Sequence, residues 1–256
     1  MKYALLNNQF VIATPHKKGA ICPLCKSPLI AKCGDVRVHH WSHKKGCICD
    51  EWREADCEWR HRWLELFSHC EVEPIIEKNG SKHFADIRTI NGTTILLRRG
   101  KVNPSELQLM EMFFDGLVWI VDLSRNRKAA SVLTKGLRCG TLRKAFKNAY
   151  RTIGGQGECF PDVWSRCRYP VVFDCSGVAM TDQLISGYLW CLLPCEENSR
   201  SDDRLVLRYR KVKLVRMLTD RGAITPRQIQ EMVSQLNDKI SRMKELWNDS
   251  SLHFGF

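Results

Sequence analysis

The chain has 256 residues, enough to bury a sizeable core as one large domain or two small ones. It contains no uninterrupted apolar run of 18 residues and no signal-peptide pattern near its start, so we expect a cytoplasmic protein without a membrane association. Forty Lys and Arg residues against 28 Asp and Glu residues give a formal net charge of +12, which favours a polyanionic partner over an acidic peptide or a neutral metabolite.

The first 49 residues predict a strand hairpin followed by a zinc-binding segment. The stretches "YALL" and "FVIA" flank a turn at Asn7-Asn8, and "SPLIAKCGDVRVHHW" predicts a second hairpin that turns at Gly34-Asp35. Around the second hairpin, two short knuckles offer four metal ligands, Cys22, Cys25, His40 and His43.

Two chelating turns joined by a hairpin suit a tetrahedral Zn²⁺ ion and leave no open position for catalysis. We therefore expect a structural zinc site in a zinc-ribbon-like hairpin. Three nearby thiols, Cys33, Cys47 and Cys49, are substitutes if one ligand is misassigned. The alternative is that the thiols are free and that His39 or His40 packs in a small core.

The next segment, residues 50–123, predicts alternating helices and strands. Three- and four-residue spacing of aromatic side chains indicates a helix over residues 50–69, and three strands follow at 71–76, 83–90 and 93–99. Asn79-Gly80 and Asn91-Gly92 are the turns between these strands. Pro104 begins a second helix, and "LVWIVDL" is typical of a strand covered on both faces. This order predicts an α/β core with a central mixed sheet flanked by helices.

The remaining sequence is rich in basic residues. An acid-free stretch at 124–151 is expected to be helical in part, "YPVVFDC" and "GYLWCLLP" predict two strands, and a second acid-free basic run covers 204–219. These runs are either solvated faces or a surface that follows phosphates. Thr225 and Pro226 begin a C-terminal amphipathic helix to about Trp247, whose apolar side is a packing or self-association face.

Five linked stretches, "CPLCKSPLIAKCGDVRVHHWSH", "CDEWREADCEWRHRWLELF", "HFADIRT", "NPSELQLMEMFFDGLVWIVD" and "PVVFDC", carry a family resemblance. Over about residues 1–195 the sequence resembles the competence protein CoiA-like family. That resemblance implies a restriction-endonuclease-like fold of the PD-(D/E)xK type with an N-terminal zinc-binding segment, and it implies that the four ligands above hold zinc. It also implies that Asp86 is the first catalytic acid, supported by Glu58 from the preceding helix, with Mg²⁺ as the catalytic cofactor.

Four segments follow from this interpretation: an N-terminal strand and zinc-binding segment at 1–49, a nuclease-like core at 50–123, a basic stretch with further strands at 124–195, and a basic segment with a C-terminal helical extension at 196–256.

The sequence departs from the family pattern at the expected active site. The strand that typically carries Glu-x-Gln followed by His-Ser has Leu96 and Arg98 in the Glu and Gln positions, with Arg99 next. In "EWRHRWL", Arg60 stands in the position of a family His and Leu64 in that of a Lys. We therefore expect a DNA-binding protein with weakened or lost nuclease activity. The residues expected to contact nucleic acid are Arg98, Arg99, Lys101, Arg125, Arg127, Lys128, Arg143 and Lys144.

Two other functions are left open by the sequence. The first is an active Mg²⁺-dependent DNA endonuclease in which Glu58 and Asp86 are joined by Glu71, Glu73 or Glu106. The second is a protein-interaction or assembly subunit of a DNA-processing or defence complex, whose basic runs meet another protein or RNA.

Overall fold

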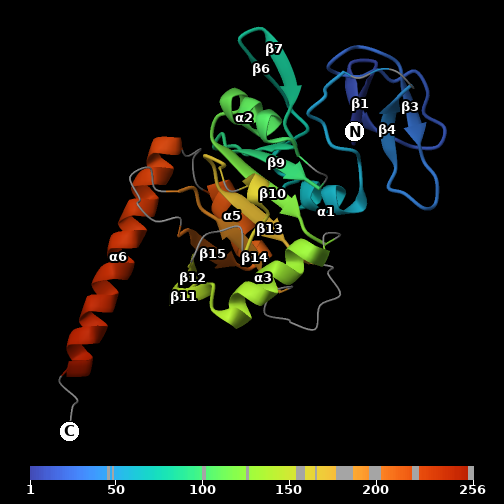
Figure 1. The fold of residues 1–256 in the computed structure, drawn as a ribbon. Coiled ribbons are helices and arrows are strands. Elements are labelled where there is room, and N and C mark those ends of the chain that lie inside the picture. The colour runs from blue at the N-terminus through green and yellow to red at the C-terminus, as the bar shows by residue number, and fades with distance from the viewer. Residues whose placement is uncertain are drawn as a thin grey trace.

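The computed structural model describes residues 1–44, 47, 49–99, 102–124, 127–153, 159–164, 166–176, 187–195, 203–220 and 225–252. A small N-terminal part built from two hairpins lies beside a larger α/β part, from which the C-terminal helix extends (Figure 1). The division of the chain into four segments stays a prediction.

The α/β part is organised around a nine-stranded mixed sheet, as the alternation of helices and strands predicted. In spatial order its strands are β11 (Leu142–Phe146), β12 (Ala149–Thr152), β15 (Leu205–Tyr209), β14 (Leu189–Leu192), β13 (Val171–Asp174), β10 (Leu117–Asp122), β9 (Thr94–Arg98), β8 (Ile87–Arg88) and β5 (Glu71–Val72). Strands β9, β10 and β13 are parallel, and the other pairs are antiparallel. Every residue of β9, β10 and β13 is buried, because helices cover both faces of the parallel strands.

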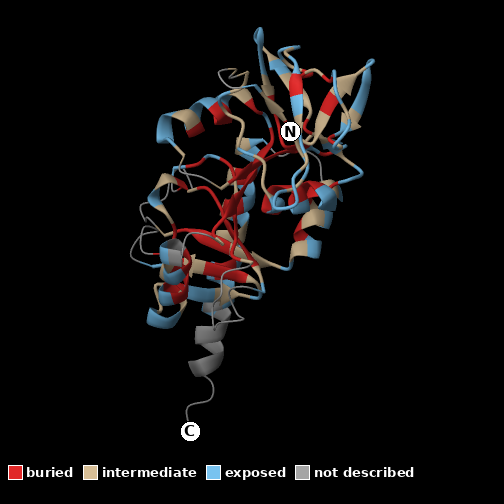
Figure 2. Ribbon diagram, turned by 90° about the vertical axis from the view of Figure 1, so that its right-hand side faces the viewer, coloured by how far each residue is buried: buried red, intermediate tan, exposed pale blue. Residues whose placement is uncertain are grey.

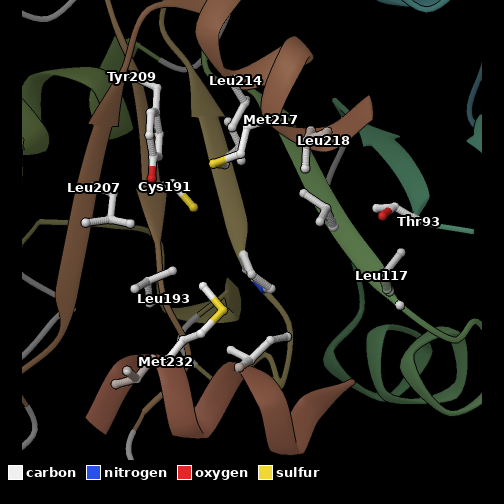
Figure 3. Close-up of a pocket in the computed structure, with 16 residues that line it drawn as sticks. Thr93, Leu117, Cys191, Leu193, Leu207, Tyr209, Leu214, Met217, Leu218 and Met232 are labelled. Atoms are coloured by element: carbon white, nitrogen blue, oxygen red, sulfur yellow. The ribbon is translucent and has the colours of Figure 1, made fainter. Parts of the chain in front are cut away.

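Helices α1 (Glu58–Leu66), α2 (Pro104–Phe113), α3 (Arg127–Cys139), α5 (Lys211–Asp220) and α6 (Pro226–Leu252), with a 3₁₀ turn η1 (Asp162–Trp164), complete this part. Val118 of β10 lines an apolar cavity of about 110 Å³ together with residues of α5 and α6. Figure 3 shows Leu214 and Met217 of α5 and Met232 of α6 around this cavity. Trp119, the neighbour of Val118, points to the other face, where its indole N–H donates to Glu111 of α2 at 3.0 Å. Helices therefore cover both sides of the sheet, and Figure 2 shows the buried residues concentrated in its strands.

The N-terminal part contains the two predicted hairpins. Strands β1 (Tyr3–Leu6) and β2 (Gln9–Ile12) turn at Asn7 and Asn8, which have φ of 51° and 63°. Strands β3 (Leu29–Lys32) and β4 (His40–His43) form the second hairpin. Their apolar side chains form a small separate core around Trp41, closed by Phe84 of the α/β part.

Two predicted strands, 71–76 and 83–90, are each divided in the structure. Their outer ends pair in the main sheet as β5 and β8, whereas their inner ends form a projecting hairpin, β6 (Ile75–Lys78) and β7 (Ser81–Phe84). This hairpin turns at Asn79 and Gly80, with φ of 51° and 79°, as their Asn-Gly sequence predicted.

The first helix begins at Glu58, so the prediction of a helix from residue 50 is wrong in its first eight positions. Residues 50–57 cross the β6–β7 hairpin instead. The Asp50 carboxylate accepts hydrogen bonds from the backbone N–H of Phe84 at 2.7 Å and from His83 Nδ1 at 3.0 Å, and Trp52 stacks on His83 at 3.6 Å between ring centroids. These tertiary contacts replace the helical hydrogen bonds that the aromatic spacing suggested.

The C-terminal third contains both predicted strands, β13 and β14, and the predicted helix α6. Thr225 caps α6 as expected, because Gln228 Oε1 accepts from the Thr225 backbone N–H at 2.9 Å and the Gln228 N–H donates to Thr225 Oγ1 at 3.3 Å. The basic run at 204–219, for which the sequence predicts no helix or strand, forms β15 and α5, with Leu214 buried. Among the described residues, no helix combines the length and apolar content needed to cross a lipid bilayer.

Candidate functional site

Three cysteines and one histidine of the N-terminal part form a candidate metal centre. The loop from Cys22 to Ser27 closes on itself, because the Cys22 N–H donates to the Ser27 carbonyl at 2.9 Å and Lys26, with φ of 60°, turns the chain back. This loop holds Cys22 and Cys25 close together. His43 comes from β4, and Cys49 comes from the segment that leaves that strand.

The ligand atoms of Cys22, Cys25, His43 and Cys49 all lie within 4.8 Å of one another. The Cys22 and Cys49 sulfurs are 3.8 Å apart, and Cys25 Sγ is 3.3 Å from His43 Nε2. Zn–S bonds of about 2.3 Å place two tetrahedral ligands about 3.8 Å apart, so the four side chains fit a structural zinc ion. Four protein ligands leave no open position for a substrate.

His40, which the sequence analysis gave as the fourth ligand, is replaced by Cys49. His40 and His43 lie three residues apart on β4, and side chains alternate between the two faces of a strand, so the two rings point to opposite faces. The His40 Nδ1 is hydrogen-bonded to the Val38 carbonyl at 2.8 Å instead. Cys49 is one of the three substitutes, with Cys33 and Cys47, that the sequence offered.

Hydrogen bonding around the centre favours the ligating form of one thiol. Burial opposes the Cys25 thiolate, but hydrogen bonds from Ser27 and His43 outweigh it and lower the pKa of this thiol to about 6. In the absence of a cation, burial raises the pKa of Cys49. A bound Zn²⁺ would stabilise the thiolates together, which is the charge balance that a zinc–thiolate site requires.

Asp86, the expected catalytic acid, is held by protein donors on both carboxylate oxygens. Oδ1 accepts from Arg60 Nε at 2.8 Å and from Arg60 Nη2 at 2.5 Å, while Oδ2 accepts from the backbone N–H of Leu97 at 2.7 Å. Arg98 Nη1 lies 3.5 Å from Oδ2. Asp86 is 6% exposed and Arg60 is 1% exposed. Two guanidinium groups and one backbone N–H therefore occupy both oxygens of the carboxylate.

The opposite edge of Arg60 binds two further acids. Its Nη1 donates to Glu73 Oε1 at 2.8 Å and to Asp56 Oδ1 at 3.0 Å. Glu73 also accepts from Arg53 at 2.5 Å, and its second oxygen accepts from the backbone N–H of Lys2 in the N-terminal part at 2.8 Å. Burial opposes ionisation of Glu73, but Arg53 and Arg60 outweigh it and hold its pKa well below the usual range. This buried network joins the N-terminal part to the α/β part.

Arg98 is buried instead of being presented to a phosphate. It is 4% exposed, its Nη2 is 3.0 Å from the sulfur of Met110, and its guanidinium lies 5.5 Å from the centroid of the Trp119 ring. Burial lowers the pKa of this guanidinium. Because its guanidinium contacts Met110 of α2, the side chain lies on the face of β9 that α2 covers, and the strand is buried along its whole length.

Glu58 does not lie beside Asp86. Its side chain is 75% exposed at the start of α1, where its partner is Arg62 at 3.8 Å. The buried face of this helix carries Trp59, Arg60 and Trp63, so position 58 faces solvent. Of the alternative acids, Glu71 is exposed and Glu73 belongs to the network with Arg60.

The carboxyl ends of β9, β10 and β13 lie at one edge of the sheet, which we call the carboxyl edge. Asp122 ends β10, Asp174 ends β13, and the two residues are directly paired in register. Arg99, which follows β9, places its Nε 3.2 Å from Asp122 Oδ2. Asp174 Oδ2 accepts from Lys211 Nζ at 3.1 Å. Each of these edge acids thus has a cation of the chain as its partner.

Two tryptophans fix Asp174 further. The indole N–H groups of Trp59 and Trp63, both from α1, donate to Asp174 Oδ2 at 3.0 and 2.9 Å. Despite burial, Lys211 and the hydrogen bonds of Ser176 lower the pKa of Asp174. The charge of Asp174 is therefore compensated inside the protein. Because its donors come from α1 and α5, this acid also joins both helices to the sheet.

The remaining residues expected to contact nucleic acid occupy different places. Lys128 on α3 is exposed, and Arg143 and Lys144 are exposed on β11, the edge strand of the sheet. The structure describes the helical backbone of Arg127 but not its side chain. Lys101 and Arg125 lie outside the described residues.

Residues 6–51 match the family described as Competence protein CoiA, N-terminal domain. This range contains all four clustered metal ligands, from Cys22 to Cys49, so the family match and the candidate metal centre coincide. No curated protein and no solved structure matches the chain. Beyond residue 51 the resemblance rests on the sequence motifs alone.

Sequence reasoning did not single out Asp122 and Asp174. Each is the last residue of a buried apolar strand, in "LVWIVD" and "VVFD". An acid that directly ends a continuous apolar run is the signal that could have found them, because the ends of parallel strands meet at one edge.

Proposed function

We propose that this protein binds nucleic acid on a nuclease-like scaffold that no longer uses a catalytic metal ion. The observation that carries the proposal is the environment of Asp86, whose oxygens are taken by Arg60, the Leu97 N–H and Arg98. A metal ion would have to displace two buried guanidinium groups from Asp86, and each would lose a charged partner in the protein interior.

The order of elements supports the nuclease-like interpretation. Helix α1, strands β5, β8 and β9, helix α2 and strand β10 follow one another in the order that the resemblance implies. Asp86 immediately precedes β8, and β9 carries Leu96 and Arg98 where an acid and a Gln are expected. The residues that would complete a Mg²⁺ site, a second carboxylate above all, are absent from the immediate partners of Asp86 in the described structure.

Charge supports binding to a polyanion. The formal net charge is +12, and the acids in the interior form ion pairs with only some of the cationic side chains. Lys128, Arg143 and Lys144 are exposed, and no ion pair with a described carboxylate involves them. Exposed cations of this kind favour phosphate contacts and strong salt dependence.

The test combines binding and cleavage with the zinc-loaded full chain. Fluorescence anisotropy with labelled duplex DNA, single-stranded DNA and RNA at two salt concentrations should show binding that weakens with salt. Nuclease assays across Mg²⁺ and Mn²⁺ should show no metal-dependent cleavage, and calorimetry should show no Mg²⁺ binding.

Two results would overturn the proposal. The first is robust Mg²⁺-dependent cleavage by the wild-type protein. The second is absence of binding to all three nucleic acids at low salt, which would favour the assembly-subunit interpretation.

A further inference from the structure

The cations along the carboxyl edge differ in whether the protein already uses their charge. Arg99 and Lys211 pair with Asp122 and Asp174. Arg208 and Arg210, at the end of β15, form no ion pair with any carboxylate that the structure describes. Arg208 is half-buried and Arg210 is exposed, so their charge is available to an external anion.

Strand register places these two arginines at the carboxyl edge. Tyr209 pairs with Leu189 of β14, Leu189 pairs with Asp174, and Asp174 pairs with Asp122. Arg208 and Arg210 therefore flank the row of residues that ends the central strands. Tyr209 points into the apolar cavity under α5 and α6 (Figure 3), so its two neighbours point to the other face of the sheet.

Aromatic rings hold both guanidinium groups. Arg208 lies 4.3 Å from the ring centroid of Tyr188, 5.4 Å from that of Tyr150 and 5.9 Å from that of Trp190. Arg210 lies 4.5 Å from the Tyr188 ring. Packing against a ring restricts a guanidinium plane without using its N–H donors, which lie in the plane and remain able to bind an oxyanion.

The strand that carries the pair is also fixed. The Arg208 backbone N–H donates to the Asn148 carbonyl at 2.8 Å, and Asn148 Nδ2 donates to the Arg208 carbonyl at 3.3 Å. Lys147, in the adjoining β11–β12 turn, is exposed at the same edge and adds positive charge. A rigid pair of arginines loses little conformational entropy when it binds a ligand.

We propose that Arg208 and Arg210 form a phosphate clamp that anchors the nucleic-acid backbone at the β14–β15 end of the carboxyl edge. This inference rests on the proposed function and names the part of the surface that performs it. Arginine binds phosphate through paired N–H donors. Two guanidinium groups beside the same tyrosine ring can therefore donate to neighbouring oxygens of a phosphate backbone. The clamp replaces Arg98 as the main arginine contact.

The test compares the double variant Arg208→Gln/Arg210→Gln with a charge-matched control, Lys82→Gln/Arg227→Gln. The control removes two exposed cations, one on β7 and one on α6, whose partners are Glu77 and Glu231. Each lost charged hydrogen bond should weaken binding about tenfold, and the slope of log affinity against log salt should fall by about 0.7–0.9 per lost phosphate contact. The control should change affinity less than about threefold.

A third variant, Arg208→Lys/Arg210→Lys, separates a clamp from charge alone. It should keep most of the salt slope but lose affinity, because lysine lacks the planar pair of donors. All variants must keep wild-type zinc content and unfolding midpoint. If the wild type binds and the Gln variant matches the control, the clamp is refuted while the proposed function stands; if the wild type binds no nucleic acid, both fail.

Discussion

Replacing Asp86 by asparagine tests whether internal cations have taken the place of a metal ion. The substitution keeps the size of the side chain and an oxygen for the Leu97 N–H, but it removes the charge that faces Arg60 and Arg98. Because all three charged side chains are at least 92% buried, the two guanidinium groups would be left without full compensation.

Removing one partner of a buried ion pair typically lowers the free energy of unfolding by about 3–5 kcal/mol. Since a domain of ordinary stability has about 5–15 kcal/mol in total, Asp86→Asn should be severely destabilised. The matched control is Asp115→Asn, in which the acid is 85% exposed and pairs with Lys78 at 3.0 Å. An exposed pair contributes about 0–1 kcal/mol, so the control should stay close to the wild type.

Urea denaturation of the zinc-loaded proteins, followed by tryptophan fluorescence, measures both differences. Trp59 and Trp63 lie on the same helix as Arg60, so their emission reports on this region. If Asp86→Asn unfolds within about 0.5 kcal/mol of the wild type, the buried ion pairs do not stabilise the fold and the argument fails. The result also decides how a nuclease assay is interpreted, because lost activity in an unfolded Asp86 variant identifies no catalytic acid.

Three further results are expected. Cys49→Ser should lose bound zinc in metal analysis whereas His40→Ala keeps it, and the reverse outcome would restore the ligand set inferred from sequence. The pKa values of Glu73 and Asp56 are lowered in the folded protein. Their ionised forms therefore stabilise the fold above the unfolded pKa of about 4, and this contribution to the free energy of unfolding is lost as the pH falls. Urea midpoints that stay constant from about pH 6 to 3 would contradict this. Thr225→Ala should lower the free energy of unfolding by about 1 kcal/mol through loss of the α6 cap, and an unchanged urea midpoint would show that the cap contributes nothing.

Local chemistry explains which elements could be predicted from the sequence. The turns at Asn7-Asn8 and Asn79-Gly80 require positive φ, and the residues that tolerate it are evident from sequence. The buried strand β10 is a continuous apolar run, and the α6 cap is a short-range motif. Each of these signals depends on neighbouring residues alone.

The errors arise where distant segments decide the outcome. His40 and His43 have the spacing of a chelating pair, but a β-strand turns their rings apart, and the ligand that replaces His40 lies nine residues further along the chain. Residues 50–57 have helical spacing, but Asp50 and Trp52 bind the β6–β7 hairpin. Neither contact could be inferred from local pattern.

Arg98 shows why the place of a residue in an expected motif does not determine whether its side chain reaches the surface. The motif position lies on an enclosed strand, and that enclosure applies to whichever side chain occupies it. A buried guanidinium needs a carboxylate, and the fold brings Asp86 to 3.5 Å from Arg98 Nη1. Arg98 therefore compensates the charge of Asp86 inside the protein instead of reaching a ligand at the surface.

The same reasoning connects the two charged centres of the molecule. At the candidate metal centre, thiolates gathered in the N-terminal part need an added cation, and zinc can supply it. At the carboxyl edge, Asp122 and Asp174 are balanced by Arg99 and Lys211, and Asp86 is balanced by Arg60; all three cations belong to the chain itself. Because these cations are permanently attached, the acids stay charge-balanced without an added ion, and the proposed phosphate contacts therefore depend on cations such as Arg208 and Arg210, which form no ion pair with a carboxylate in the described part of the chain.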